Sequence, residues 1–261
     1  MREWILAETN YGNTKDRPFD VAVLPLGATE PHNLHLPYGT DTIQVETLAE
    51  RACEAAFQRG ERVVKLPAIP YGTETNLHAF PLAMNLNPST LLAIVRDLAV
   101  SLERSGVRKL LLLNGHGGND FKPLLRELHL ETGVHLFLCD WFRGISADIQ
   151  KSLFKEPGDH AGAMETAFIL ACRPDLVVSD QATGRLRADE GAIRLTKLDA
   201  VNRGWISITR PWHLLTTNTG SGNPHEATLE QGQTLVDTLV SRLTDFLVEL
   251  AQTPIDDRFP Y

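Results

Sequence analysis

The chain has 261 residues, of which 43% are hydrophobic and 22% charged, and its formal net charge is −8 at pH 7. This length and composition predict a single α/β domain over residues 1–261 and are typical of a globular enzyme. The acidic balance and the lack of a Lys/Arg cluster argue against nucleic-acid binding, and without an apolar run of about 18 residues we expect no membrane span.

Cysteine usage and the first residues indicate a reducing compartment. The three cysteines, Cys53, Cys139 and Cys172, are widely spaced and form no CxxC pair. We therefore expect neither a disulfide framework nor a zinc–thiolate site. Residues 1–8 mix charges with apolar side chains and do not resemble a signal peptide, so we expect a cytoplasmic protein.

Strand-like and helix-like segments alternate along the chain. Apolar runs predict strands at 21–26, 62–66, 109–113 and 134–139. Periodicity and capping residues predict helices at 44–59, 88–105, 120–132 and 161–172, and a last helix that begins at Asn223-Pro224. This alternation predicts a three-layer αβα fold with a mainly parallel sheet. Residues 175–222 are less regular and leave extra strands or a subunit contact open.

Polar side chains follow two of the predicted strands. Glu30, His32 and Asp41 come after the strand at 21–26, and His116 follows the strand at 109–113 within Asn114–Asn119. Ligands of open parallel sheets bind outside the carboxyl ends of the strands, so these residues should lie near one another. Neutral imidazoles with carboxylates suit Zn²⁺, Mn²⁺ or Fe²⁺. The alternative is a pair of solvated loops, because charged residues are mostly exposed.

A third polar cluster surrounds the start of the helix at 161–172. Glu165 is the single charged residue of that apolar helix. A buried carboxylate needs a compensating partner, and a metal ion or an arginine would serve equally well. Asp159 and His160 precede the helix and can face the same pocket. For Asp159, a plain helix N-cap is the alternative.

The chain resembles the creatininase family of metal-dependent amidohydrolases. The resemblance rests on residues 26–41, 114–119 and 159–166, with a further match at 222–227. It implies a creatininase-like fold with two divalent metal ions per subunit, assembled as a homo-oligomer that is often a hexamer in this family. By position, it implies five metal ligands, with Asp41 between the two ions: Glu30, His32, Asp41, His116 and Glu165.

The resemblance also implies roles for other residues. His160 matches the proton-transfer histidine of the family, and Asp159 beside it is expected to orient the ring. Creatininase has a tyrosine and a ligating glutamate where this chain has Gly117 and Gly118. Because that tyrosine lines the creatinine pocket, and because residues 71–84 lack the family's FPGT run, we do not expect creatinine to be the substrate.

The substrate pocket is expected to include Gly117, Gly118, His78 and Trp141. For Trp141 a place in the core is the alternative, because aromatic side chains contribute much of a protein's buried area. The expected partner is a small molecule, and neither nucleic acid nor membrane is expected.

Together these features predict metal-dependent hydrolysis of a C–N bond in a cyclic amide or a formamide-type small molecule. Two ions of Zn, Mn or Fe would hold a bridging water and lower its pKa. His160 would then donate a proton to the departing nitrogen. Two alternatives stay open: hydrolytic C–C cleavage or ring opening of a keto-sugar or diketone, and a catalytically inactive, metal-free scaffold.

Overall fold

The structure is a computed structural model that describes residues 1–156 and 158–261. Within this part of the chain, four strands form one sheet in the order β2-β1-β3-β4, and each pairing is parallel. The strands are β1 (Val21–Leu26), β2 (Val63–Lys65), β3 (Lys109–Asn114) and β4 (His135–Asp140). The predicted parallel sheet is confirmed.

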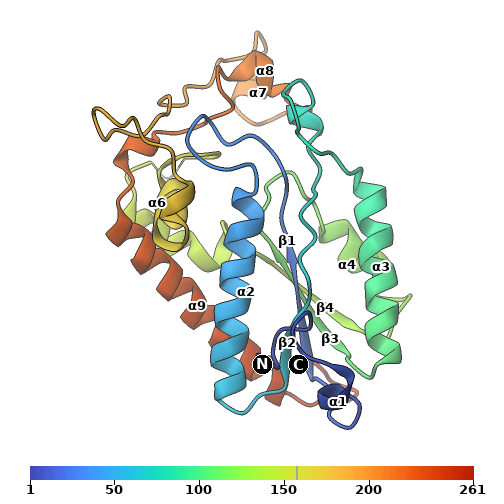
Figure 1. Cartoon of the computed structure of the whole chain (residues 1–261). Helices are drawn as coiled ribbons and strands as arrows, with labels where there is room; N and C mark the ends of the chain where they lie inside the picture. Colours follow the sequence, from blue (N-terminus) through green and yellow to red (C-terminus); the bar gives the residue numbers. More distant parts are fainter. Residues whose placement is uncertain (157) are drawn as a thin grey trace.

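Helices cover both faces of the sheet, as Figure 1 shows. The helices that cover the faces are α2 (Thr40–Gln58), α3 (Pro88–Arg104), α4 (Lys122–Leu128), α6 (Ala163–Cys172) and α9 (Leu229–Gln252). α2, α6 and α9 pack on one face against Val21 and Val23 of β1. α3 and α4 pack on the other face against Ala22 and Leu24, because neighbouring residues of a strand point to opposite sides. The three-layer αβα architecture is therefore confirmed.

Short elements connect this framework. The short α-helices are α1 (Tyr11–Thr14), α5 (Ala147–Leu153), α7 (Asp199–Asn202) and α8 (Trp212–Leu215). The 3-10 helices are η1 (Thr75–Leu77), η2 (Gly144–Ser146), η3 (Pro174–Leu176) and η4 (Pro224–Glu226). For residues 175–222 the sequence allowed either extra strands or a subunit contact. In the part of the chain that the structure describes, this segment adds no strand to the sheet. None of the helices in the described ranges combines the length and apolar character that a bilayer span requires.

The first helix of the sheet framework begins earlier than predicted. α2 begins at Thr40 and not at Gln44. Its N-cap is Gly39, which has no side chain to accept a hydrogen bond, so no capping residue marks this start in the sequence. Asp41 consequently lies in the first turn of α2 and not in the preceding loop.

The last helix begins later than predicted. The Asn223 side chain accepts a hydrogen bond from the His225 amide at 3.0 Å, but this bond caps the short helix η4. α9 begins at Leu229, where Thr228 and Gln231 form a capping box. Smaller corrections apply to α4, which is shorter than predicted at both ends, and to α6, which begins at Ala163.

Candidate metal centre

Asp41 lies between two imidazoles at the carboxyl edge of the sheet. The first turn of α2 carries it, and the residue is 2% exposed. Its Oδ1 is 3.2 Å from His32 Nε2 and its Oδ2 is 3.1 Å from His116 Nδ1. Each carboxylate oxygen therefore faces a different ring, which is the arrangement that a bridging ligand of two ions requires.

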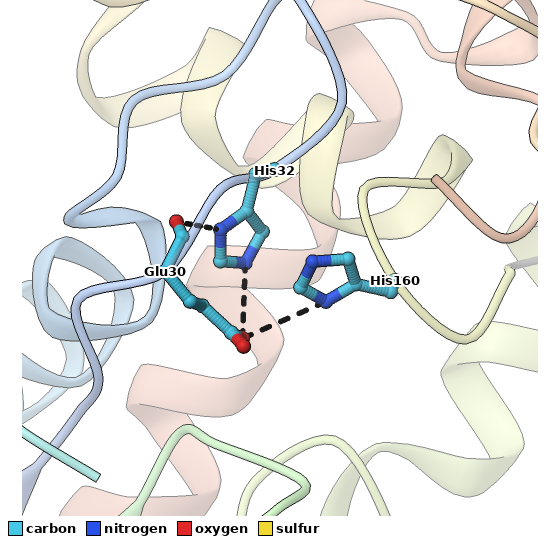
Figure 2. A group of neighbouring side chains, drawn as sticks. All are labelled: Glu30, His32 and His160. Carbon is cyan, nitrogen blue, oxygen red and sulfur yellow. Dashed lines mark hydrogen bonds and ion pairs between the residues drawn. The ribbon is translucent and has the colours of Figure 1, made fainter. Parts of the chain in front are cut away.

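The loop after β1 places Glu30 beside the same imidazoles. His32 Nδ1 donates to the Glu30 carbonyl oxygen at 3.0 Å, because a carbonyl can only accept, and this leaves Nε2 free to face Asp41. The Glu30 carboxylate Oε1 is 3.0 Å from His116 Nδ1, 3.8 Å from His32 Nε2 and 3.6 Å from His160 Nδ1. Figure 2 shows His32 and His160 both directed at this one oxygen.

His116 follows β3 and is fixed from two sides. Its backbone amide donates to Asn114 Oδ1 at 3.2 Å, and its Nε2 donates to the Thr73 carbonyl oxygen at 3.1 Å. Nδ1 is thereby directed at the carboxylates of Glu30 and Asp41. A Cβ at Gly118 would lie 2.3 Å from His116 Nε2, so this ring position requires glycine there.

Glu165 reaches the cluster from the first turn of α6. Its Oε2 is 4.0 Å from His32 Nε2, and it accepts the Ala161 amide proton at 2.5 Å. Ala161 has a φ of 49°, in the left-handed region that few residues other than glycine adopt. This strained backbone turns the Ala161 amide toward the carboxylate and places His160 over His32, with ring centroids 4.2 Å apart.

Burial and charge perturb the pKa values of the cluster strongly. Burial opposes ionisation of His32, but Asp41, Glu165 and Glu30 raise its pKa to about 10. The pKa of Glu30 is held well below its usual value by His116 and His160, against the effect of burial. Burial raises the pKa of Glu165. These shifts are those of a carboxylate-rich site in which protonated imidazoles supply the positive charge.

Sequence reasoning missed one buried carboxylate. Glu74 is 1% exposed, and its Oε1 is 3.3 Å from His116 Nε2. Burial raises its pKa to about 10. It follows β2 by nine residues, in a segment without predicted structure. The available signal was that Glu74 is the single carboxylate between residues 66 and 96, just after a strand of the same sheet.

The cluster opens into a cavity of about 330 Å³. Gly117, Gly118, Asp159 and His160 line it, as do Glu74 and Arg210. Asp159 does not orient the His160 ring as expected. His160 Nε2 donates to the Pro31 carbonyl oxygen at 3.0 Å, whereas the Asp159 side chain is mostly exposed and lies 3.5 Å from Arg210. Asp159 is also not the N-cap of α6, which is Gly162.

Two residues expected in the substrate pocket lie elsewhere. Trp141 is completely buried in the core, with its ring centroid 5.2 Å from that of Phe168. His78 is exposed, and its ring lies edge-on to His213 with centroids 6.0 Å apart. Neither side chain lines the cavity that the described residues form. For Trp141, the alternative of a core position accounts for what is observed.

The donor set fits divalent metal ions. Oxygen and nitrogen atoms lie within 4.8 Å of one another in three groups, which are Glu30–His32–His160, Glu30–Glu74–His116 and His32–Asp41–Glu165. In the described part of the chain, no Lys or Arg pairs with any of these carboxylates. Buried carboxylates without a Lys or Arg partner, gathered with imidazoles that lose their protons when a metal ion binds, are the ligands of Zn²⁺, Mn²⁺ and Fe²⁺ sites.

A family model described as creatinine amidohydrolase matches residues 7–247. The chain belongs to the creatininase family. One relative of this creatininase-family chain is a mycofactocin precursor peptide peptidase of Mycobacterium ulcerans, 29% identical over 238 residues that cover 85% of this chain and 83% of the relative. The creatinine amidohydrolase of Pseudomonas putida is 30% identical over 181 residues, which cover 62% of this chain and 67% of that relative.

Solved structures share the creatininase fold. A Bacteroides fragilis NCTC 9343 protein, provisionally named a creatinine amidohydrolase, superposes with a TM-score of 0.88 at 34% identity, covering 98% of this chain and all of that chain. Members of the creatininase family are hydrolases, and a hydrolase site at the carboxyl edge of the sheet agrees with the position of the cluster. The five side chains that the sequence singled out as metal ligands lie together there.

Proposed function

We propose that this chain is a metal-dependent hydrolase of a C–N bond in a cyclic amide or formamide-type small molecule other than creatinine. The observation that supports it most strongly is the position of Asp41, whose two oxygens face His32 and His116 separately. Solved creatininases include a manganese form and a Zn–Zn form. We infer two divalent ions per subunit, held by Glu30, His32, Asp41, His116 and Glu165.

The residues around the cavity suit hydrolysis of a small amide. When bound, two divalent ions would supply Lewis-acid activation of a water and of the substrate carbonyl. His160 donates from Nε2 to the Pro31 carbonyl, so its Nδ1 is free to carry a proton to or from the cavity. A Cβ at Gly117 would meet no atom within 4 Å, which leaves that wall of the cavity open.

The first test combines metal analysis with a substrate panel. We expect the reconstituted protein to hold two equivalents of Zn²⁺ or Mn²⁺ and to hydrolyse cyclic amides, N-formyl compounds or short peptides. Asp41→Asn should lose both ions and all turnover, because one carboxylate faces both imidazoles. Less than one equivalent in the wild-type protein would favour the metal-free scaffold instead.

A second candidate is hydrolytic ring opening of a cyclic ketone. It is favoured by a Thermotoga maritima relative named 3-dehydro-scyllo-inosose hydrolase, 25% identical over 173 residues. Hydroxide would add to the ketone carbon, the bond to the adjacent ring carbon would break, and that carbon would leave as an enolate that takes its proton from water, so no leaving nitrogen has to be protonated. His160→Asn should therefore abolish amide turnover but retain a substantial part of ketone turnover, so the same panel with this variant separates the two candidates.

A further inference from the structure

Glu74 is a buried carboxylate to which neither sequence reasoning nor the family comparison gives a role. Its side chain is fully buried, and in the described part of the chain neither Oε1 nor Oε2 has a hydrogen-bond partner. The nearest donor is His116 Nε2 at 3.3 Å, but that nitrogen carries a single proton and donates it to the Thr73 carbonyl oxygen. A buried carboxyl group without a donor either keeps its proton, as in the metal-free protein, or is ionised beside a cation.

The backbone around Glu74 is held firmly against the loop after β3. The Thr73 amide donates to Asn119 Oδ1 at 3.0 Å, and the Glu74 amide donates to Asn85 Oδ1 at 2.8 Å. A Cβ at Gly72 would lie 2.9 Å from Asn119 Oδ1 and 3.0 Å from His116 Cδ2, so the segment approaches this loop as closely as glycine permits. The carboxylate is thus aimed into the cluster by fixed neighbours.

Glu74 shares a possible ion with two of the inferred ligands. One ligand atom each of Glu30, Glu74 and His116 lies within 4.8 Å of the others. Atoms at such separations can all reach one Zn²⁺ ion at about 2.0–2.2 Å after small side-chain movements. His116 faces Asp41 Oδ2, whereas His32 faces Oδ1, so Glu74 beside His116 would serve one of the two ions and not both.

We propose that Glu74 is a sixth metal ligand and that it binds the ion held by Glu30 and His116. This inference rests on the metal dependence proposed above. It assigns unequal coordination to the two ions, with the extra carboxylate on the side of His116. Removing the Glu74 carboxylate should therefore weaken one ion selectively.

Metal binding to variants tests the assignment without relying on turnover. In competition with a chromogenic chelator, Glu74→Gln should bind one Zn²⁺ at least about tenfold more weakly than the wild type, a loss of the size seen when metal-site partners are removed. The second Zn²⁺ should keep its affinity. Glu249→Gln, on the exposed face of α9, is the matched control and should bind both ions as the wild type does.

Two spectroscopic and structural readouts separate a ligand from a neighbour. With Co²⁺ in place of Zn²⁺, Glu74→Gln should change the visible d–d absorption of one site. In a crystal of the wild-type protein loaded with Mn²⁺, anomalous scattering should place an ion within about 2.0–2.6 Å of a Glu74 oxygen. This measurement holds even if the variant fails to fold.

The inference is overturned if Glu74→Gln keeps both affinities and the cobalt spectrum, or if both ions in the crystal lie more than about 3.5 Å from Glu74. Such a result leaves the proposed hydrolase intact, provided that the wild-type protein binds two ions and turns over substrate. If the wild type binds no metal, the proposed function and this inference fail together, and that result is recognised before any variant is made.

Discussion

At the scale of single residues, backbone carbonyls fix the imidazoles of the site. Because a carbonyl accepts but never donates, each bonded ring nitrogen must carry the proton. The three bonds run from His32 Nδ1 to Glu30 O, from His116 Nε2 to Thr73 O and from His160 Nε2 to Pro31 O. The other nitrogen of each ring then faces the carboxylates. Hydrogen bonds of this kind set the tautomer of metal-binding histidines, so the fold prepares the rings before any ion arrives.

His35 lies close to the site and gives the fold a pH dependence of its own. The residue is fully buried; its Nε2 is 2.8 Å from Thr166 Oγ1, and its Nδ1 has no hydrogen-bond partner among the described residues. Burial and the nearby His32 lower the pKa of His35 from 6.5 to about 4. The unfolded chain therefore takes up this proton first, and stability is lost as the pH falls from 6.5 toward 4.

We predict that His35→Gln reduces this loss. Between about pH 7.5 and about pH 5, the free energy of unfolding of the wild type should fall by about 2 kcal/mol more than that of the variant. Urea denaturation in the presence of a chelator measures the difference without a metal contribution. His129→Gln, which replaces an exposed histidine after α4, should follow the wild type. An equal pH dependence in all three proteins would show that His35 does not titrate in this window.

At the scale of the elements, the contact between α6 and α9 positions Glu165. A Cβ on Gly232 of α9 would lie 1.8 Å from the Ala167 carbonyl oxygen and 3.0 Å from Ala171 Cβ, both on α6. The two helix backbones therefore approach more closely than any other residue allows. α6 begins with the turn that carries Glu165, so this contact sets how far that carboxylate reaches toward His32.

We predict that Gly232→Ala destabilises the protein by about 1–3 kcal/mol, because a backbone atom cannot yield as a flexible side chain can. In an open helix the same change would stabilise, since alanine is the better helix former by about 1 kcal/mol. Gly144→Ala is the control, because a Cβ there would meet no atom within 4 Å. In urea denaturation, the free energy of unfolding should fall for Gly232→Ala and stay equal or rise for Gly144→Ala. Equal free energies of unfolding for the two variants would mean that α6 and α9 can move apart without loss of stability.

Some elements were predictable from local sequence and others were not. The strand at Val21–Leu26 was found to the residue, because a continuous apolar run between polar loops has one interpretation in a buried parallel sheet. The start of α2 was missed, because Gly39 caps it without a side-chain bond. The start of α9 was misplaced, because Asn223-Pro224 is a good capping pattern that a short 3-10 helix uses instead.

The site residues that belong to a sequence motif could be predicted. The residue that joins the site only because the fold brings it there could not. Glu30, His32 and His116 stand in loops that follow strands, and Asp41 closes the first motif. Glu74 belongs to no motif, and its place beside His116 depends on the path of the chain from β2 across the sheet edge. The same reason explains Trp141, which follows β4 directly but turns into the core.

At the scale of the whole molecule, the order of the strands explains why these segments meet. β2, β1 and β3 are neighbours in the sheet, so the segments that follow them carry Glu74, Glu30 and His116 to one edge. α2 returns from the same edge with Asp41, and α6 adds Glu165 from outside the sheet. The cluster therefore needs the complete parallel order, and a local change in one loop cannot recreate it.

The segment that includes α7 and α8 lies above this edge (Figure 1), and several of its apolar side chains are exposed to solvent. They are Ile193, Leu195, Leu198, Trp205, Ile206 and Ile208, with Leu195 79% and Trp205 72% exposed. Exposed apolar side chains this close together in the sequence are more than the scattered single residues of an ordinary surface and indicate an interaction surface. Because the segment also supplies Arg210 and Trp212 to the cavity, a second copy bound there would cover the mouth of the site.

We therefore predict that the chain self-associates through residues 193–208. Light scattering after size exclusion should give a mass of at least two chains for the wild type, and Trp205→Glu should shift it toward one chain, because a charge in an apolar interface must be desolvated without a partner. Leu130→Glu is the matched control, since Leu130 is 90% exposed outside this segment and should leave the mass unchanged. A monomeric wild type at about 10 μM, a concentration that saturates most specific interfaces, would refute the assembly; a Trp205→Glu variant with unchanged mass would place the interface elsewhere.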